Sequence, residues 1–104
     1  MANYVIEYKN RYDYGYRFLL KSNGDYVTFK SIVDARKKCI KLIKEHIATL
    51  CVIRGDGEKL VYITELGEFV YENRTTNTWT MLREDGTLGK RVNPHAIWTV
   101  LVKS

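Results

Sequence analysis

The chain has 104 residues, 45% of them hydrophobic, and carries a formal net charge of +5. This length predicts one domain, 1–104, and eight tyrosines and two tryptophans exclude a disordered composition. Residues 1–47 hold ten Lys/Arg and five Asp/Glu, a net charge of +5, whereas residues 48–104 hold seven of each. A basic first half beside a neutral second half indicates an anionic partner.

The same sequence argues against a membrane or secreted protein. Its apolar runs are far shorter than the roughly 20 residues that cross a bilayer. The N-terminus lacks the basic segment and apolar stretch of a secretory signal. Cys39 and Cys51 both lie in apolar surroundings, which is typical of free, buried thiols in a reducing compartment. We therefore expect no membrane partner and a cytoplasmic location.

The first third of the chain predicts three short strands. Residues 4–8 alternate in polarity, and residues 16–20 and 26–29 are rich in aromatic and β-branched side chains around Asn23-Gly24. The same signal recurs at Asp56-Gly57 and Asp85-Gly86. Asn-Gly and Asp-Gly between apolar runs predict hairpins with type I′ turns, in which both central residues have positive φ.

One amphipathic helix is predicted over residues 32–46. Ser31 is an N-cap residue, and Asp34 stands three positions later in place of the capping-box Glu. Half of the helical wheel is apolar and the other half is charged. The apolar half contains Ile32, Ala35, Cys39, Ile40, Leu42, Ile43 and Ile47. Such a helix is expected to dock on a sheet.

The rest of the chain predicts a β-meander. Strands are expected at residues 50–53, 60–63, 68–71 and 79–82, in a short segment reaching Val92, and at residues 97–102. The fold class is therefore α+β, with one amphipathic helix packed on a mainly antiparallel, hairpin-rich sheet of seven or eight strands. Residues 1–47 form a ββ(β)α half of it. An exposed edge strand at residues 4–8 or 97–102 would allow a homodimer by edge-strand pairing.

The charged side of the helix is a candidate surface for phosphates. Lys37, Lys41 and Lys44 share about one fifth of the helical wheel, with Lys38 beside them. A lysine ridge attracts a nucleic-acid backbone through counterion release, although a simply solvated helix face has the same composition. Arg36 lies inside the apolar arc, where it either snorkels past the sheet edge or meets a partner such as Glu7 or a tyrosine.

A second candidate surface is the segment between the first two predicted strands. It interleaves cations and aromatic rings in Arg11, Tyr12, Tyr14, Tyr16 and Arg17. Such rings stack on unpaired bases in single-strand binders, and Tyr and Arg also anchor protein interfaces. The period of two is equally compatible with tyrosines that cover one face of a hairpin. Both surfaces together are predicted to form one continuous docking surface.

Residue patterns typical of catalysis or cofactor binding are missing from the sequence. His46, His95 and the two cysteines do not have the spacing of a zinc site, and no phosphate-binding or dinucleotide motif occurs. Lys21, Arg54 and Arg83 each precede a predicted turn, and they would converge only if the turns met at one end of the sheet. We expect no enzyme activity, no metal and no cofactor.

The functional prediction is a small binding protein that acts in nucleic-acid transactions through its basic, Tyr/Arg-rich surface. The alternative is a protein-binding regulator or inhibitor, of the kind that phages or mobile elements encode. It would dock on a nucleic-acid enzyme, or on another acidic or nucleic-acid-binding protein, without contacting nucleic acid. The predicted binding residues are Arg11, Tyr12, Tyr14, Tyr16, Arg17, Arg36, Lys37, Lys38, Lys41 and Lys44.

Overall fold

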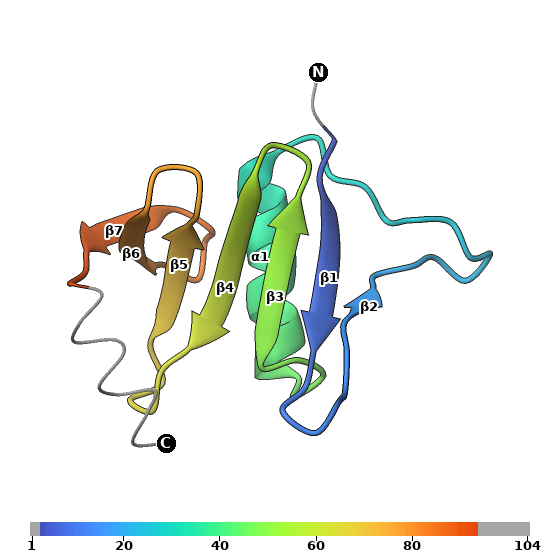
Figure 1. Cartoon of the computed structure of the whole chain (residues 1–104), viewed down its shortest axis with the longest axis horizontal. Helices are drawn as coiled ribbons and strands as arrows, with labels where there is room; N and C mark the ends of the chain where they lie inside the picture. The colour runs from blue at the N-terminus through green and yellow to red at the C-terminus, as the bar shows by residue number, and fades with distance from the viewer. Residues whose placement is uncertain (1–2, 94–104) are drawn as a thin grey trace.

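Within residues 3–93 a single helix packs on one face of a seven-stranded antiparallel sheet, so the predicted α+β class is confirmed (Figure 1). The computed structural model describes residues 3–93. The elements are β1 (Val5–Lys9), β2 (Arg17–Phe18), α1 (Ile32–Lys44), β3 (Leu50–Arg54), β4 (Glu58–Ile63), β5 (Phe69–Asn73), β6 (Thr78–Leu82) and β7 (Leu88–Arg91). The strand predicted at residues 97–102 lies outside the described residues.

The strand order is β2-β1-β3-β4-β5-β6-β7, and every neighbouring pair is antiparallel. The expectation that residues 4–8 form an exposed edge is wrong, because β1 pairs with β2 on one side and with β3 on the other. Within residues 3–93 the edges are β2 and β7, which are two and four residues long. Short edge strands offer little backbone for pairing with another chain.

The hairpin turns lie where the sequence predicts them, but they are not type I′. Asn23, Asp56 and Asp85 are absent from the described residues with positive φ, whereas the glycine after each has a φ of +75° to +91°. Gly24 N–H donates to the Lys21 carbonyl and Lys21 N–H to that of Asp25, which closes a three-residue loop. Asn23 and Asp85 act through their side chains instead, accepting a hydrogen bond from the backbone two residues on.

The first hairpin is much less regular than predicted. Only β2 remains of the outgoing strand at residues 16–20, and the return at residues 26–29 pairs through two isolated bridges, Leu20 with Tyr26 and Tyr4 with Phe29. The chain therefore leaves the edge of β1 after Leu19 and comes back to it at Phe29. Figure 1 shows this excursion projecting sideways from the sheet.

The helix begins as predicted and ends two residues early. The Ser31 hydroxyl accepts hydrogen bonds from the amides of Val33 and Asp34, which confirms the N-cap. At the other end, Ile47 N–H donates to the Leu42 carbonyl and His46 N–H to that of Ile43. This pattern is a Schellman motif, and it places His46 at the left-handed position with φ 60°.

The sheet buries apolar side chains on both faces. Beneath α1 the core includes Ile6, Ile53, Val61 and both cysteines, as predicted for the thiols. On the face opposite α1, a smaller buried cluster consists of Val52, Leu60, Tyr62 and Val70. Burial on both faces explains why β3 and β4 read as apolar runs rather than as alternating patterns.

Candidate nucleic-acid interface

The exposed apolar side chains of residues 3–93 are concentrated in one segment. We call residues 9–30 the aromatic arm, since they run from the end of β1 to the residue before the helix cap. Among the described residues, nine large hydrophobic side chains are exposed, and six of them belong to the aromatic arm: Tyr12, Tyr14, Tyr16, Phe18, Leu20 and Tyr26. A patch of this kind is characteristic of a surface that binds something.

Four of these side chains form what we call the aromatic strip: Tyr16, Phe18, Leu20 and Tyr26, which are 39–51% exposed. Phe18 pairs with Glu7, and Glu7 pairs with Val52 of the cluster opposite α1. Since side chains alternate along a strand, Phe18 and Tyr16 project on the sheet face opposite α1. The rings of Phe18 and Tyr26 meet edge to face, with centroids 5.0 Å apart.

Cations accompany the rings of the aromatic arm. The Lys9 ammonium lies 5.9 Å from the centroid of the Tyr16 ring, and the Arg11 guanidinium lies 6.0 Å from that of Tyr12. Arg17 forms an ion pair with Asp13 at 3.9 Å and is itself largely exposed. The arm contains five Lys/Arg and two Asp, a net charge of +3, so exposed rings and excess positive charge occur in the same segment.

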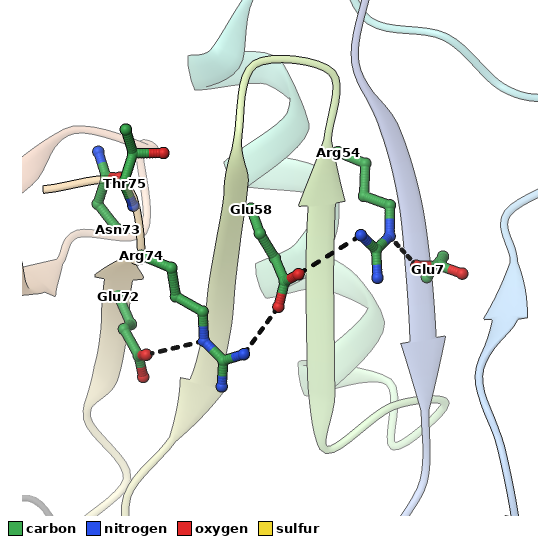
Figure 2. A network of polar contacts seen from close by, with 7 residues as sticks. All are labelled: Glu7, Arg54, Glu58, Glu72, Asn73, Arg74 and Thr75. Atoms are coloured by element: carbon green, nitrogen blue, oxygen red, sulfur yellow. Dashed lines mark hydrogen bonds and ion pairs between the residues drawn. The ribbon is translucent and has the colours of Figure 1, made fainter. Parts of the chain in front are cut away.

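A ladder of ion pairs crosses the sheet beside the aromatic strip, and the sequence analysis missed it. Figure 2 shows Arg54 between Glu7 and Glu58, and Arg74 between Glu58 and Glu72. The Nη1–carboxylate distances to Glu58 are 3.5 Å from Arg54 and 2.9 Å from Arg74. Glu7 raises the pKa of Arg54, and Glu72 raises that of Arg74.

The ladder limits the basic surface. With three carboxylates and two guanidinium groups it has a net charge of −1, so it does not attract phosphates as the arm does. On the same sheet face, burial and the neighbouring Glu72 carboxylate raise the pKa of Tyr62 to about 12. At its far end, Asn73 caps the β5–β6 turn by accepting from the Thr75 amide (Figure 2). The pairs Glu7–Arg54 and Glu58–Arg74 join residues that are distant along the chain, so sequence spacing did not reveal the ladder.

Arg36 has partners inside the fold, and its predicted role in binding stays a prediction. Its guanidinium stacks 4.4 Å from the ring centroid of Tyr71 and donates to the Gly86 carbonyl at 3.3 Å. It therefore has the aromatic partner that the sequence allowed, rather than snorkelling, and Glu7 pairs with Arg54 instead. Burial raises the pKa of Tyr71, while Arg36 opposes this shift. Arg36 fastens the β6–β7 turn to α1.

The helix lysines line an open groove of about 460 Å³ on α1, and we call this feature the lysine groove. It is lined by Phe29, Asp34, Lys37, Lys38, Ile40, Lys41, Lys44 and Glu84. Lys44 forms an ion pair with Glu84 of the β6–β7 turn. Because α1 lies on one sheet face and the aromatic strip on the other, the predicted single continuous surface is wrong for Tyr16.

The three cations before the turns do not converge. Arg54 ends β3 and is bound in the ladder, while Arg83 follows β6, whose direction is opposite to that of β3. Arg83 instead donates to the Leu88 carbonyl across its own turn at 2.7 Å. Lys21 remains exposed in the arm.

Residues 3–93 contain no cluster of three or more His, Cys, Asp or Glu side chains that could hold a metal ion. Burial raises the pKa of the Cys39 thiol, with Cys51 adding to the shift, so this thiol is not activated as a nucleophile. His95 lies outside the described residues. Among the helices described, none has the length and apolar content needed to span a membrane.

Comparison of the chain with protein families, with curated proteins and with solved structures gives no match.

Proposed function

We propose that this chain is a non-enzymatic binding protein whose aromatic arm docks on single-stranded nucleic acid. The observation that carries the proposal is that exposed rings and excess cations occupy the same segment, residues 9–30. Unpaired bases offer flat apolar faces to stack on rings, and their phosphates provide the negative charge that lysines and arginines neutralise.

In this proposal the tyrosines of the aromatic arm stack on bases and its cations contact phosphates. Tyr16, with the Lys9 ammonium near its ring, offers a stacking platform beside a cation, and Tyr12 with Arg11 offers a second one. Base–aromatic stacking contributes about 1–3 kcal/mol per base as judged by alanine substitution. Arg17 and Lys21 are exposed cations of the same arm and would contact phosphates without reading sequence.

A second candidate partner is an acidic protein surface, in line with a regulator that docks on a nucleic-acid enzyme. Leu20 favours it, because an aliphatic side chain that is 48% exposed has no stacking role. The edge-to-face contact of Phe18 with Tyr26 also leaves the two rings poorly arranged for parallel stacking on bases. Aromatic anchors with an arginine nearby are typical of protein hot spots.

Binding of a fluorescently labelled single-stranded oligonucleotide, followed by anisotropy as salt is raised from about 50 to 200 mM, tests the proposal. We expect a linear fall of log K with log salt for the wild type. Tyr12→Ala/Tyr16→Ala is expected to weaken binding about 10-fold or more, since two stacking contacts are lost. Tyr12→Phe/Tyr16→Phe should bind nearly as the wild type does, because the rings remain.

The matched control is Leu66→Ala/Leu88→Ala, which removes two exposed apolar side chains outside the arm. It is expected to leave affinity unchanged. If no oligonucleotide binds at low salt, or if the tyrosine variant binds as tightly as the control, the single-strand function is refuted. A protein partner that survives nuclease treatment, and whose capture requires Phe18 and Leu20, would then support the second candidate.

A further inference from the structure

The lysine groove is a second basic surface, separate from the aromatic arm. Lys37, Lys41 and Lys44 follow one row of the helix at i, i+4 and i+7. At 1.5 Å per residue they extend over about 10 Å, the length of about three phosphates in one strand of a duplex. Lys38 lines the same groove from the neighbouring row.

Most of the positive charge in this groove is unneutralised. Four ammonium groups face two carboxylates, those of Asp34 and Glu84, and Glu84 is bound to Lys44. Within the part of the chain that the structure describes, Lys37, Lys38 and Lys41 make no ion pair. Three ammonium groups are therefore available to an anionic partner.

The groove also differs from the arm in what it lacks. Among the described lining residues Phe29 is the one aromatic side chain, and it is partly buried against the core, in which Ile40 is fully included. The groove therefore has charge but no exposed platform on which a base could stack. Such a surface fits a backbone whose bases are already paired with one another.

We propose that the lysine groove binds the phosphate backbone of a nucleic-acid duplex, so that the protein bridges a duplex and a single strand. Duplex binding at the groove is independent of the arm, whereas the bridging rests on the function proposed for the arm. The sheet separates the two surfaces, because α1 lies against one face (Figure 1). The pairing of Phe18 with Glu7 places the aromatic strip on the other face. One molecule can then hold both segments at once.

A capture assay tests the bridging. A biotinylated DNA duplex is immobilised on beads, and a fluorescent single-stranded DNA of unrelated sequence is added with the protein. We expect the wild type to retain the strand on the beads. Lys38→Glu/Lys41→Glu should lose this capture while binding the free strand within about 3-fold of the wild type, since the arm is unchanged. Tyr12→Ala/Tyr16→Ala should still bind the duplex but leave the strand in solution.

Two further variants make the result specific to the groove. Lys90→Glu/Arg91→Glu makes the same charge change on β7, and it should reduce capture far less than the groove variant does. Glu84→Gln frees Lys44 and removes a carboxylate, so it should tighten duplex binding and steepen its log–log salt slope by about 1. A merely structural role for these lysines does not predict this gain.

The outcomes distinguish failure of duplex binding at the lysine groove from failure of strand binding by the aromatic arm. Duplex binding that is unchanged in Lys38→Glu/Lys41→Glu, or reduced equally in Lys90→Glu/Arg91→Glu, overturns the groove. Duplex binding that depends on the groove, without capture of a strand that the free protein does bind, overturns the bridging alone. If the free strand does not bind at all, the function of the arm fails, and with it the bridging.

Discussion

Two hairpins of this protein use the same turn but differ in what surrounds it. Gly24 and Gly86 each donate to a carbonyl three residues earlier and have φ near +90°. Gly86 lies against Val33 and Lys37 of α1, and Arg36 donates to its carbonyl, whereas nothing lies within 4 Å of the side-chain position at Gly24. The turn is thus specified locally, and tertiary contacts decide whether it becomes part of the core or remains a projecting arm.

The largest difference in stability is expected between a substitution in the core and one in the arm. Ile53 is fully buried beneath α1, and Ile53→Ala should lower the free energy of unfolding by about 2–5 kcal/mol. Phe18→Ala, in the aromatic strip, should lower it by only about 0.5–1.5 kcal/mol, through loss of the ring contact with Tyr26. Urea denaturation followed by circular dichroism measures both values. Equal losses would mean that the arm is packed as firmly as the sheet.

The two turn glycines give the next largest difference. Alanine at either position must adopt positive φ, which costs about 1–2 kcal/mol. At Gly86 the added methyl would also lie 2.8 Å from the Val33 carbonyl oxygen, and overpacking of this kind costs about 1–3 kcal/mol more. Gly86→Ala should therefore lower the melting temperature clearly further than Gly24→Ala. Identical melting temperatures would contradict the docking of the β6–β7 turn on α1.

A smaller effect, of opposite sign, is expected at the left-handed residue that ends α1. His46 has φ 60°, and glycine adopts this conformation without steric strain, so His46→Gly should raise the free energy of unfolding by about 0.5–1 kcal/mol. Asn77 has φ 55° in the β5–β6 turn, but asparagine tolerates this region better. Asn77→Gly should therefore stabilise less. Denaturation midpoints of the two variants decide this comparison.

The smallest effect concerns pH and again separates the two hairpins. In the β6–β7 turn, the hydroxyl and amide of Thr87 lower the pKa of Asp85, while Asn23 holds the corresponding place in the arm and does not titrate. A lowered pKa in the folded state means that the stabilisation is fully present above the unfolded-state pKa. It is lost as the pH falls through the folded-state pKa.

Asp85→Asn should remove this acid-side loss. Asn23→Asp should not reproduce it in the arm, because the new carboxylate would lie beside that of Asp25, to which Asn23 donates at 3.2 Å. Stability measured between about pH 2 and 5 provides the test, since the unperturbed carboxyl titrates near 3.9. An unchanged pH profile in Asp85→Asn would show that the carboxylate of this turn contributes nothing to stability.

Local patterns predicted much of the fold correctly. The Ser31 cap, the apolar side of α1 and the Asn-Gly or Asp-Gly turns each involve residues that are close in sequence, so their chemistry can be read directly. The strand predicted at residues 26–29 is reduced to two isolated bridges, because Tyr26 and Thr28 are exposed and add little to the core. The type I′ assignment failed because Asn23 and Asp85 hydrogen-bond the backbone through their side chains instead of adopting positive φ.

The candidate site was harder to predict from the sequence than the fold, because it depends on tertiary contacts. Exposure of Tyr12, Tyr14 and Tyr16 agrees with their assignment to a surface, although their role in binding stays a prediction. The partners of Arg36, Tyr71 and Gly86, could not be identified from the sequence because they are distant along the chain. The ion-pair ladder and the separation of the two basic surfaces follow from strand register and from the side on which α1 packs, which no spacing along the chain reveals.

Both thiols of the protein lie at the contact between α1 and β3, where Cys39 and Cys51 have no exposed surface. A thiol reagent reaches them only when the helix lifts from the sheet, so the labelling rate reports that opening directly. Rearrangement of the arm on its own would leave both sulfur atoms protected. The wild-type chain thus allows movements of the arm to be distinguished from loss of the core without any introduced probe.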